Sequence, residues 1–238
     1  AKLIKLFQFC KLEGTEKLRD LYYQEDDFCA QGFCWLTMSY KNSKIEDRQS
    51  CLHSASEAFR KGRNDFMHSQ TEEHIKLYRN QSMLEEKFHQ KFVDLSVHQT
   101  IKKLIQEKEY KLAEELKKDC KVPDKRYWWL KISVLAEQDH WLELEKFSKL
   151  KKSPIGYEPF VDVCLKRKNK YEANKYVSKV KEENKVGYLV KLGQLEEAAK
   201  IAFESKDEEL LSNIESRVVA NRALKERIEN MRQQLTRR

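Results

Sequence analysis

The side chains best suited to chemistry in this chain are thiols, imidazoles and carboxylates, and their spacing assigns none of them an evident task. Cys29, Cys34, Cys51 and His53 are the closest approach to a zinc-ligand set, but their spacing matches no common zinc pattern. The six cysteines include no Cys-x-x-Cys pair, so they indicate reduced and mostly buried thiols. We therefore expect no metal and no cofactor.

The sequence also lacks the common catalytic motifs. It contains no Gly-rich phosphate loop, no Gly-x-Ser-x-Gly and no His-Glu-x-x-His. Carboxylates are abundant, but they recur four residues from lysines, a spacing typical of ion pairs on helix surfaces. We expect a noncatalytic protein with no catalytic residue.

The basic residues are unevenly distributed along the chain. The formal net charge is +8, and residues 146–191 hold thirteen Lys or Arg against five Asp or Glu, while residues 217–238 hold seven against two. Such segments suit an acidic protein surface, anionic lipid or phosphate, and they are also common on solvated helix faces. A basic helical-repeat module that binds RNA or anionic membrane is therefore an alternative function. The aromatic residues fall at core spacings and no nucleic-acid-binding signature is present, so we expect no nucleic acid.

The scarcity of turn-forming residues indicates the fold class. The 238 residues include 6 Gly and 3 Pro, where average usage gives roughly 17 and 12. Because β-sandwiches, barrels and α/β enzymes need Gly and Pro at their many turns, these classes are excluded. Apolar residues recur at helical spacing almost throughout, which predicts an all-α protein.

From about residue 97 a pair of helices recurs with a period of about 30 residues. The second helix of each pair begins at Tyr110, Trp141, Tyr171 and Leu195, so the starts are 31, 30 and 24 residues apart. The first helices are predicted at about 97–105, 125–136, 158–166 and 183–192. This period predicts an α-solenoid of paired antiparallel helices in a right-handed stack. We expect it to cover residues 1–213, with 214–238 as a charged amphipathic C-terminal helix or a frayed tail.

The N-terminal third is predicted from local signals. A first helix through Leu12 ends at Gly14 in the left-handed position after its last turn, and Thr15 begins the next helix. Gly32 marks a bend. A helix over about 44–67 precedes a second long helix that opens at the capping box Ser69–Glu72. Because the chain enters an apolar run at once, without a cap or a leader, we expect a fragment of a longer protein.

The hexapeptide Asp124–Trp129 is the most informative short segment. Successive helical residues are about 100° apart, so its last three residues, all aromatic, cover more than half of the helix circumference and predict an inner helix. Arg126 lies in the first turn, where a cation opposes the helix dipole. It either pairs with Asp119 or Asp124, or it points outward to an acidic partner, and charge placement alone favours neither.

Four segments of the chain together resemble one known family. They are Leu3–Phe28, Pro123–Lys131, Leu144–Tyr157 and Asn169–Ala173. They are similar to the C-terminal region of the vacuolar-protein-sorting protein 16 family, over nearly the whole chain and more weakly beyond about residue 212. The resemblance implies the solenoid end of a subunit of the HOPS and CORVET tethering complexes, whose β-propeller is missing here. These complexes bring late endosomes, autophagosomes and lysosomes together for SNARE-driven fusion.

The resemblance also implies a partner and a location. The family's C-terminal solenoid recruits vacuolar-protein-sorting protein 33, an SM-family SNARE chaperone, through a region that matches about 43–137 here. The chain is expected to be cytoplasmic and peripheral on late endosome and lysosome membranes, through this partner and the other complex subunits. Around Cys29–Thr37 the sequence departs from the family, and Gln70 replaces a small residue. The expected partner-binding residues are Phe66, Gln70, His74, Leu77, Lys125, Arg126 and Tyr127.

Overall fold

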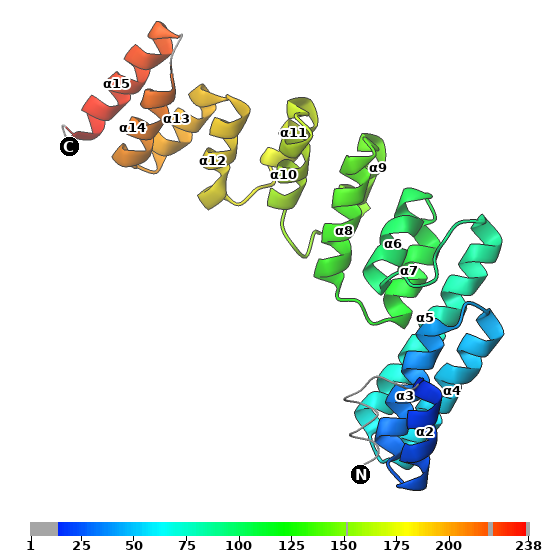
Figure 1. Ribbon diagram of the computed structural model, residues 1–238. Helices are drawn as coiled ribbons and strands as arrows, with labels where there is room; N and C mark the ends of the chain where they lie inside the picture. Colours follow the sequence, from blue (N-terminus) through cyan, green and yellow to red (C-terminus); the bar gives the residue numbers. More distant parts are fainter. Residues whose placement is uncertain (1–13, 151, 219–220, 237–238) are drawn as a thin grey trace. The chain divides into compact units, whose positions relative to one another are not determined.

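The protein is all-α, as its composition predicts. The computed structural model describes residues 14–150, 152–218 and 221–236, which contain fourteen helices and no strand (Figure 1). The helix predicted through Leu12 lies outside these residues. By contacts the chain divides into two compact units, residues 1–100 and 101–238, and the division falls inside α6 (Val97–Gln106).

The first unit contains four consecutive helices. They are α2 (Thr15–Gln24), α3 (Phe28–Lys41), α4 (Ile45–Lys61) and α5 (Asp65–Phe88). The prediction that Gly14 adopts the left-handed conformation is wrong, because its φ is −66° and it stands in extended backbone just before α2. The predicted bend at Gly32 is also wrong, since α3 runs through it. A Cβ at Gly32 would lie 2.7 Å from the Phe59 ring, so this glycine allows α4 to approach closely.

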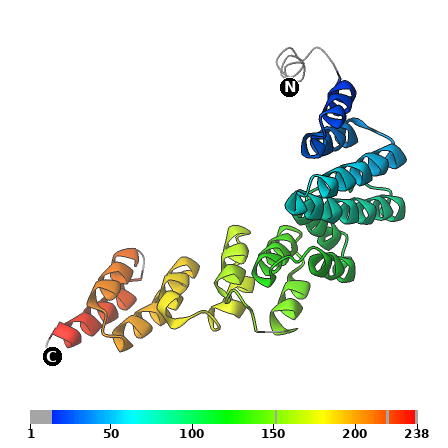
Figure 2. The ribbon, with the colours of Figure 1, turned by 90° about the horizontal axis from the view of Figure 1, so that it is seen from below.

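The two long helices, α4 and α5, lie side by side (Figure 2), and the break between them falls earlier than predicted. The chain turns over residues 62–64, and the Asn64 side chain accepts a hydrogen bond from the Met67 N–H at 3.1 Å. The predicted capping box at Ser69–Glu72 therefore lies inside α5. Glu72 does not cap the helix, because its carboxylate accepts a 2.6 Å hydrogen bond from the Ser56 hydroxyl of α4.

The second unit confirms the helical repeat. Its second helices begin close to the predicted residues, and its first helices match the predicted ranges to within about a residue. The helices are α7 (Tyr110–Asp119), α8 (Asp124–Glu137), α9 (Trp141–Leu150), α10 (Glu158–Lys166), α11 (Lys170–Val177), α12 (Glu182–Leu192) and α13 (Leu195–Glu204).

The turn inside each pair explains how the chain manages with so few glycines. The same turn position has a positive φ in all four pairs, and it is occupied by Lys108 (63°), Asp139 (56°), Lys168 (58°) and Gly193 (85°). The next residue closes the turn through its N–H, as in the 2.9 Å bond from the Asn169 N–H to a carbonyl of α10. Three of the four left-handed positions thus hold a charged residue instead of glycine.

Aromatic rings link successive repeats in the core of the second unit. Trp128 of α8 lies 4.1 Å from Phe147 of α9 and 6.4 Å from Phe160 of α10, measured between ring centroids. Phe160 in turn lies 5.1 Å from Tyr176 of α11. All four side chains are buried. Each repeat therefore covers an apolar face of its neighbour, which is the property that makes a solenoid stable.

Two further helices, α14 (Glu208–Arg217) and α15 (Arg222–Thr236), complete the described chain. The predicted boundary at 213/214 falls inside α14. Ile228 of α15 is fully buried, and Arg232 donates a 2.7 Å hydrogen bond to the Glu215 carboxylate. Helix α15 thus packs on the helices before it, with a buried apolar residue and an ion pair.

Candidate partner-binding surface

Four of the predicted partner-binding residues share one face of α5. Phe66, Gln70, His74 and Leu77 are spaced by four, four and three residues, which places them along one side of a helix. Phe66 is 71% exposed, Gln70 is exposed, and His74 and Leu77 are half-buried. We call these four residues the α5 face. It offers an exposed ring and an amide above a partly buried imidazole and leucine, a composition suited to a protein partner.

A residue that the sequence did not indicate extends the α5 face. Tyr40 of α3 is 60% exposed, its hydroxyl lies 3.4 Å from His74 Nδ1, and the two ring centroids are 5.7 Å apart. Burial, with a smaller effect of the Arg48 charge, lowers the pKa of His74 below its usual value. This shift favours the neutral imidazole, so this edge of the face is mainly aromatic.

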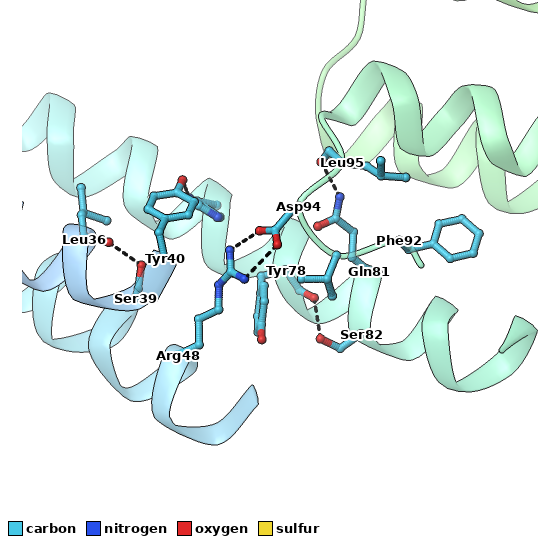
Figure 3. Close-up of polar contacts among 12 residues, drawn as sticks. Leu36, Ser39, Tyr40, Arg48, Tyr78, Gln81, Ser82, Phe92, Asp94 and Leu95 are labelled. Atoms are coloured by element: carbon cyan, nitrogen blue, oxygen red, sulfur yellow. Dashed lines mark hydrogen bonds and ion pairs between the residues drawn. The ribbon is translucent and has the colours of Figure 1, made fainter. Parts of the chain in front are cut away.

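An ion pair with a buried arginine lies beside Tyr40 (Figure 3). The Arg48 guanidinium of α4 donates two hydrogen bonds to the Asp94 carboxylate, one of them 3.2 Å long. Its central carbon lies 5.3 Å from the ring centroid of Tyr40 and 5.0 Å from that of Tyr78. Arg48 is buried, and its hydrogen bonds lower the pKa of Asp94. We call this arrangement the Arg48 clasp; it holds α3, α4, α5 and the segment after α5 together.

Two more side chains of α5 hold the segment that follows it. One Glu85 carboxylate oxygen accepts hydrogen bonds from the N–H groups of Phe92 and Val93, at 2.6 and 2.7 Å. Gln81 donates to the Leu95 carbonyl at 2.6 Å (Figure 3). These bonds satisfy backbone groups that no helix pairs, so the segment is fixed against α5 despite its irregular conformation.

The other three predicted residues stand at the start of α8, in the second unit. The side chains of Lys125 and Arg126 are exposed, and neither makes a hydrogen bond or an ion pair with any other residue that the structure describes. Asp124 pairs with Lys117, so this candidate partner for Arg126 is already engaged. Tyr127 is a correction: its side chain is 2% exposed, so it packs inside the unit and offers no direct contact to a partner. Trp129 of the same aromatic run is 45% exposed.

Part of the basic segment 146–191 is neutralised within the chain. Lys146, Lys149, Arg167 and Lys175 each form an ion pair with a nearby carboxylate, at distances from 2.5 to 2.9 Å. Some of the charge surplus that suggested RNA or membrane binding is thus paired with carboxylates of the chain itself.

Five of the six cysteines lie within the described residues, and Cys10 lies outside them. Cys34, Cys51 and Cys164 are buried, and Cys29 and Cys120 are partly buried. Burial raises the pKa of the Cys164 thiol to about 12. Across residues 14–150, 152–218 and 221–236, no three His, Cys, Asp or Glu side chains are placed to hold a metal ion. In the same residues no helix combines the length and apolarity needed to cross a membrane.

Comparison with known proteins gives one consistent family. A family model described as "Vps16, C-terminal region" matches residues 3–234. The chain is 38% identical to a vacuolar protein sorting-associated protein 16 homolog of Dictyostelium discoideum, over 98% of this chain and 29% of that protein. A Drosophila melanogaster homolog of the same name is 38% identical over 69% of this chain and 20% of its own length. A probable homolog of Schizosaccharomyces pombe is 31% identical over 89% and 26%. The chain spans less than a third of each of these relatives, and it belongs to the family of Vps16 C-terminal regions.

Proposed function

We propose that this chain is a noncatalytic scaffold within the HOPS and CORVET tethering complexes, and that it recruits the SM-family protein vacuolar-protein-sorting protein 33. Membership in the family supports the first part, since its members are named for vacuolar protein sorting. The observation that carries the second part is the state of Arg126, which is exposed and unpaired within the described residues. An arginine that the chain itself leaves unpaired is available to an acidic group of a partner.

The proposed mechanism is rigid presentation of a surface. The α5 face is backed by the Arg48 clasp and by the hydrogen bonds that fix the segment after α5. The start of α8 is backed by the buried Tyr127 and Trp128. Because both surfaces stand on packed helices, a partner would immobilise few side chains on binding, which limits the entropic cost of association. The bound protein would then be placed where membranes meet, on late endosomes and lysosomes.

The test uses gel filtration of the 238-residue chain with purified vacuolar-protein-sorting protein 33. The wild-type chain is expected to co-elute with the partner, and Arg126→Glu is expected to abolish co-elution. Lys166→Glu is the matched control, because Lys166 is exposed at the end of α10 and lies outside the proposed surface. Circular dichroism must show equal helicity for all three proteins. Unchanged co-elution of a folded Arg126→Glu variant would refute the role of Arg126.

A further inference from the structure

A small cavity in the second unit plays no part in the proposed docking of an SM-family protein. It has a volume of about 240 Å³ and lies between α7, α8 and α9. Its walls include the ring of Tyr110 from α7, and Phe147 and Leu150 from α9. Leu150 is 74% exposed, so apolar surface continues outward from the cavity. This volume is below the range of pockets for drug-sized ligands and cofactors, and it suits one or two side chains.

A largely buried lysine, with no hydrogen-bond acceptor among the described residues, lines this cavity. Lys131 of α8 is only 6% exposed, and its Nζ lies 4.5 Å from the ring centroid of Phe147 and 4.8 Å from that of Tyr110. Its ion-pair partner within the described residues is Glu114, whose oxygen is 3.9 Å away and outside hydrogen-bonding distance. Aromatic faces attract this cation, but they offer it no hydrogen-bond acceptor.

A second donor in the cavity wall is also unsatisfied. The hydroxyl of Tyr110 is buried and makes no hydrogen bond within the described residues. The charged residues of the lining favour a single negative charge. The lining carries Lys111, Lys131 and Lys146 against Glu114 and Glu143, and Glu143 is paired with Lys146 at 2.8 Å. The surplus of one positive charge suits one carboxylate.

We propose that this cavity binds an acidic side chain of a partner protein, within a peptide segment that places an aliphatic side chain beside it. The carboxylate accepts a hydrogen bond from Lys131, beside the buried Tyr110 hydroxyl. The aliphatic side chain packs on Phe147 and Leu150. This surface belongs to α7, α8 and α9 and makes no use of Arg126 or of the α5 face, so the chain has a second protein-binding site of its own.

The probes are two capped tripeptides that differ only in the carboxylate, acetyl-Leu-Glu-Leu-amide and acetyl-Leu-Gln-Leu-amide, together with hexanoate. Binding is followed through the Cε–Hε signals of the 238-residue chain labelled with ¹³C-lysine, and the Lys131 signal is assigned by its loss in Lys131→Met. The Glu peptide should shift this signal to saturation at millimolar concentration. The Gln peptide should bind at least about tenfold more weakly, a difference of about 1.4 kcal/mol.

Variants separate binding from a merely structural role of Lys131. Glu114→Gln removes the carboxylate that competes for Lys131, so affinity for the Glu peptide should rise severalfold. Lys131→Met should lower it at least about tenfold, as read from the Tyr110 and Phe147 ring signals. Lys118→Met removes an exposed cation from α7 and should change nothing. Equal binding of the two peptides, no saturable shift, or weaker binding by Glu114→Gln would each overturn the proposal. Binding of hexanoate without binding of the Glu peptide would overturn the assignment to a peptide.

Discussion

In the Arg48 clasp, removal of Asp94 should destabilise the fold more than removal of Arg48. The Arg48 side chain is 8% exposed and the Asp94 side chain is 48% exposed, so the cation is the buried member of the pair. Asp94→Asn leaves a buried guanidinium without its carboxylate. Hydrogen bonds to charged groups contribute about 1.5–3 kcal/mol. Because Asp94 is half-exposed, water can replace part of the hydrogen bonding that its carboxylate gives to Arg48. We therefore expect a loss of about 2 kcal/mol in the free energy of unfolding.

Replacing the arginine of the pair should destabilise the fold less. Arg48→Met removes the buried cation and leaves an apolar side chain between Tyr40 and Tyr78, while Asp94 turns to water. Replacing a buried ion by an apolar group of similar length is often neutral, so a loss of about 1 kcal/mol or less is expected. The double variant should be no less stable than Arg48→Met alone. Arg60→Met is the control, because its ion pair with Glu57 is exposed.

The assay is amide hydrogen exchange of α4 and α5 peptides, read by mass spectrometry, because it reports on the first unit by itself. Asp94→Asn should accelerate exchange of these peptides by roughly thirtyfold, which corresponds to about 2 kcal/mol. If Arg48→Met accelerates exchange as much as Asp94→Asn, or if Asp94→Asn leaves it unchanged, the reasoning about the buried cation is wrong.

The clasp also determines the direction in which the stability of the fold changes with pH. Arg48 lowers the pKa of Asp94 below its usual 3.8, so the folded state gains stability from the carboxylate above that pH and loses it as pH falls through the lowered pKa. The difference in stability between the wild type and Asp94→Asn should therefore be constant from pH 7 to about pH 5 and should shrink below pH 3.8.

Two further predictions concern stability and are measured by thermal unfolding. Gly32→Ala should destabilise by about 1–3 kcal/mol because its Cβ would lie 2.7 Å from Phe59, whereas Gly187→Ala, with nothing within 4 Å, should stabilise by up to about 1 kcal/mol. Lys175→Met should destabilise by about 2 kcal/mol because it removes the 2.8 Å ion pair of Glu172, whose side chain is 8% exposed. Adding Glu172→Gln should restore part of that loss, and no recovery would contradict the assigned cause.

The solenoid was predictable because its signals are local and repeated. Each pair of helices carries its own apolar stripe and polar turn, so errors at one repeat do not move the next. The positive φ of turn residues such as Lys108 and Lys168 was not predictable, because a lysine at that position looks like any other polar loop residue. The turn is imposed by the packing of the two helices that it joins.

The first unit was predicted less well, because tertiary contacts override its local signals. Ser69–Glu72 has the form of a capping box, but Glu72 bonds to α4, and Asn64 caps the helix one turn earlier. Gly32 reads as a helix breaker in sequence, whereas its role is to admit the ring of Phe59.

The candidate site shows the same limit. The spacing of the α5 face and the exposure of Arg126 follow from helix geometry, so both could be inferred. Tyr40 and Arg48 could not, because they reach His74 and Asp94 across 34 and 46 residues. The burial of Tyr127 depends on the helices packed around α8, and a run of three aromatic residues does not reveal which of them stays exposed.

The most direct test of the central claim is site-specific photo-crosslinking to purified vacuolar-protein-sorting protein 33. Benzoylphenylalanine replaces Phe66 on the α5 face, Lys125 at the start of α8, or Tyr171 of α11 as a control. Phe66 and Tyr171 are equally suitable hosts, with 71% and 74% exposure. The account predicts crosslinks from positions 66 and 125 and none from 171. A complex that forms without crosslinks from 66 and 125, or that crosslinks only from 171, would contradict it.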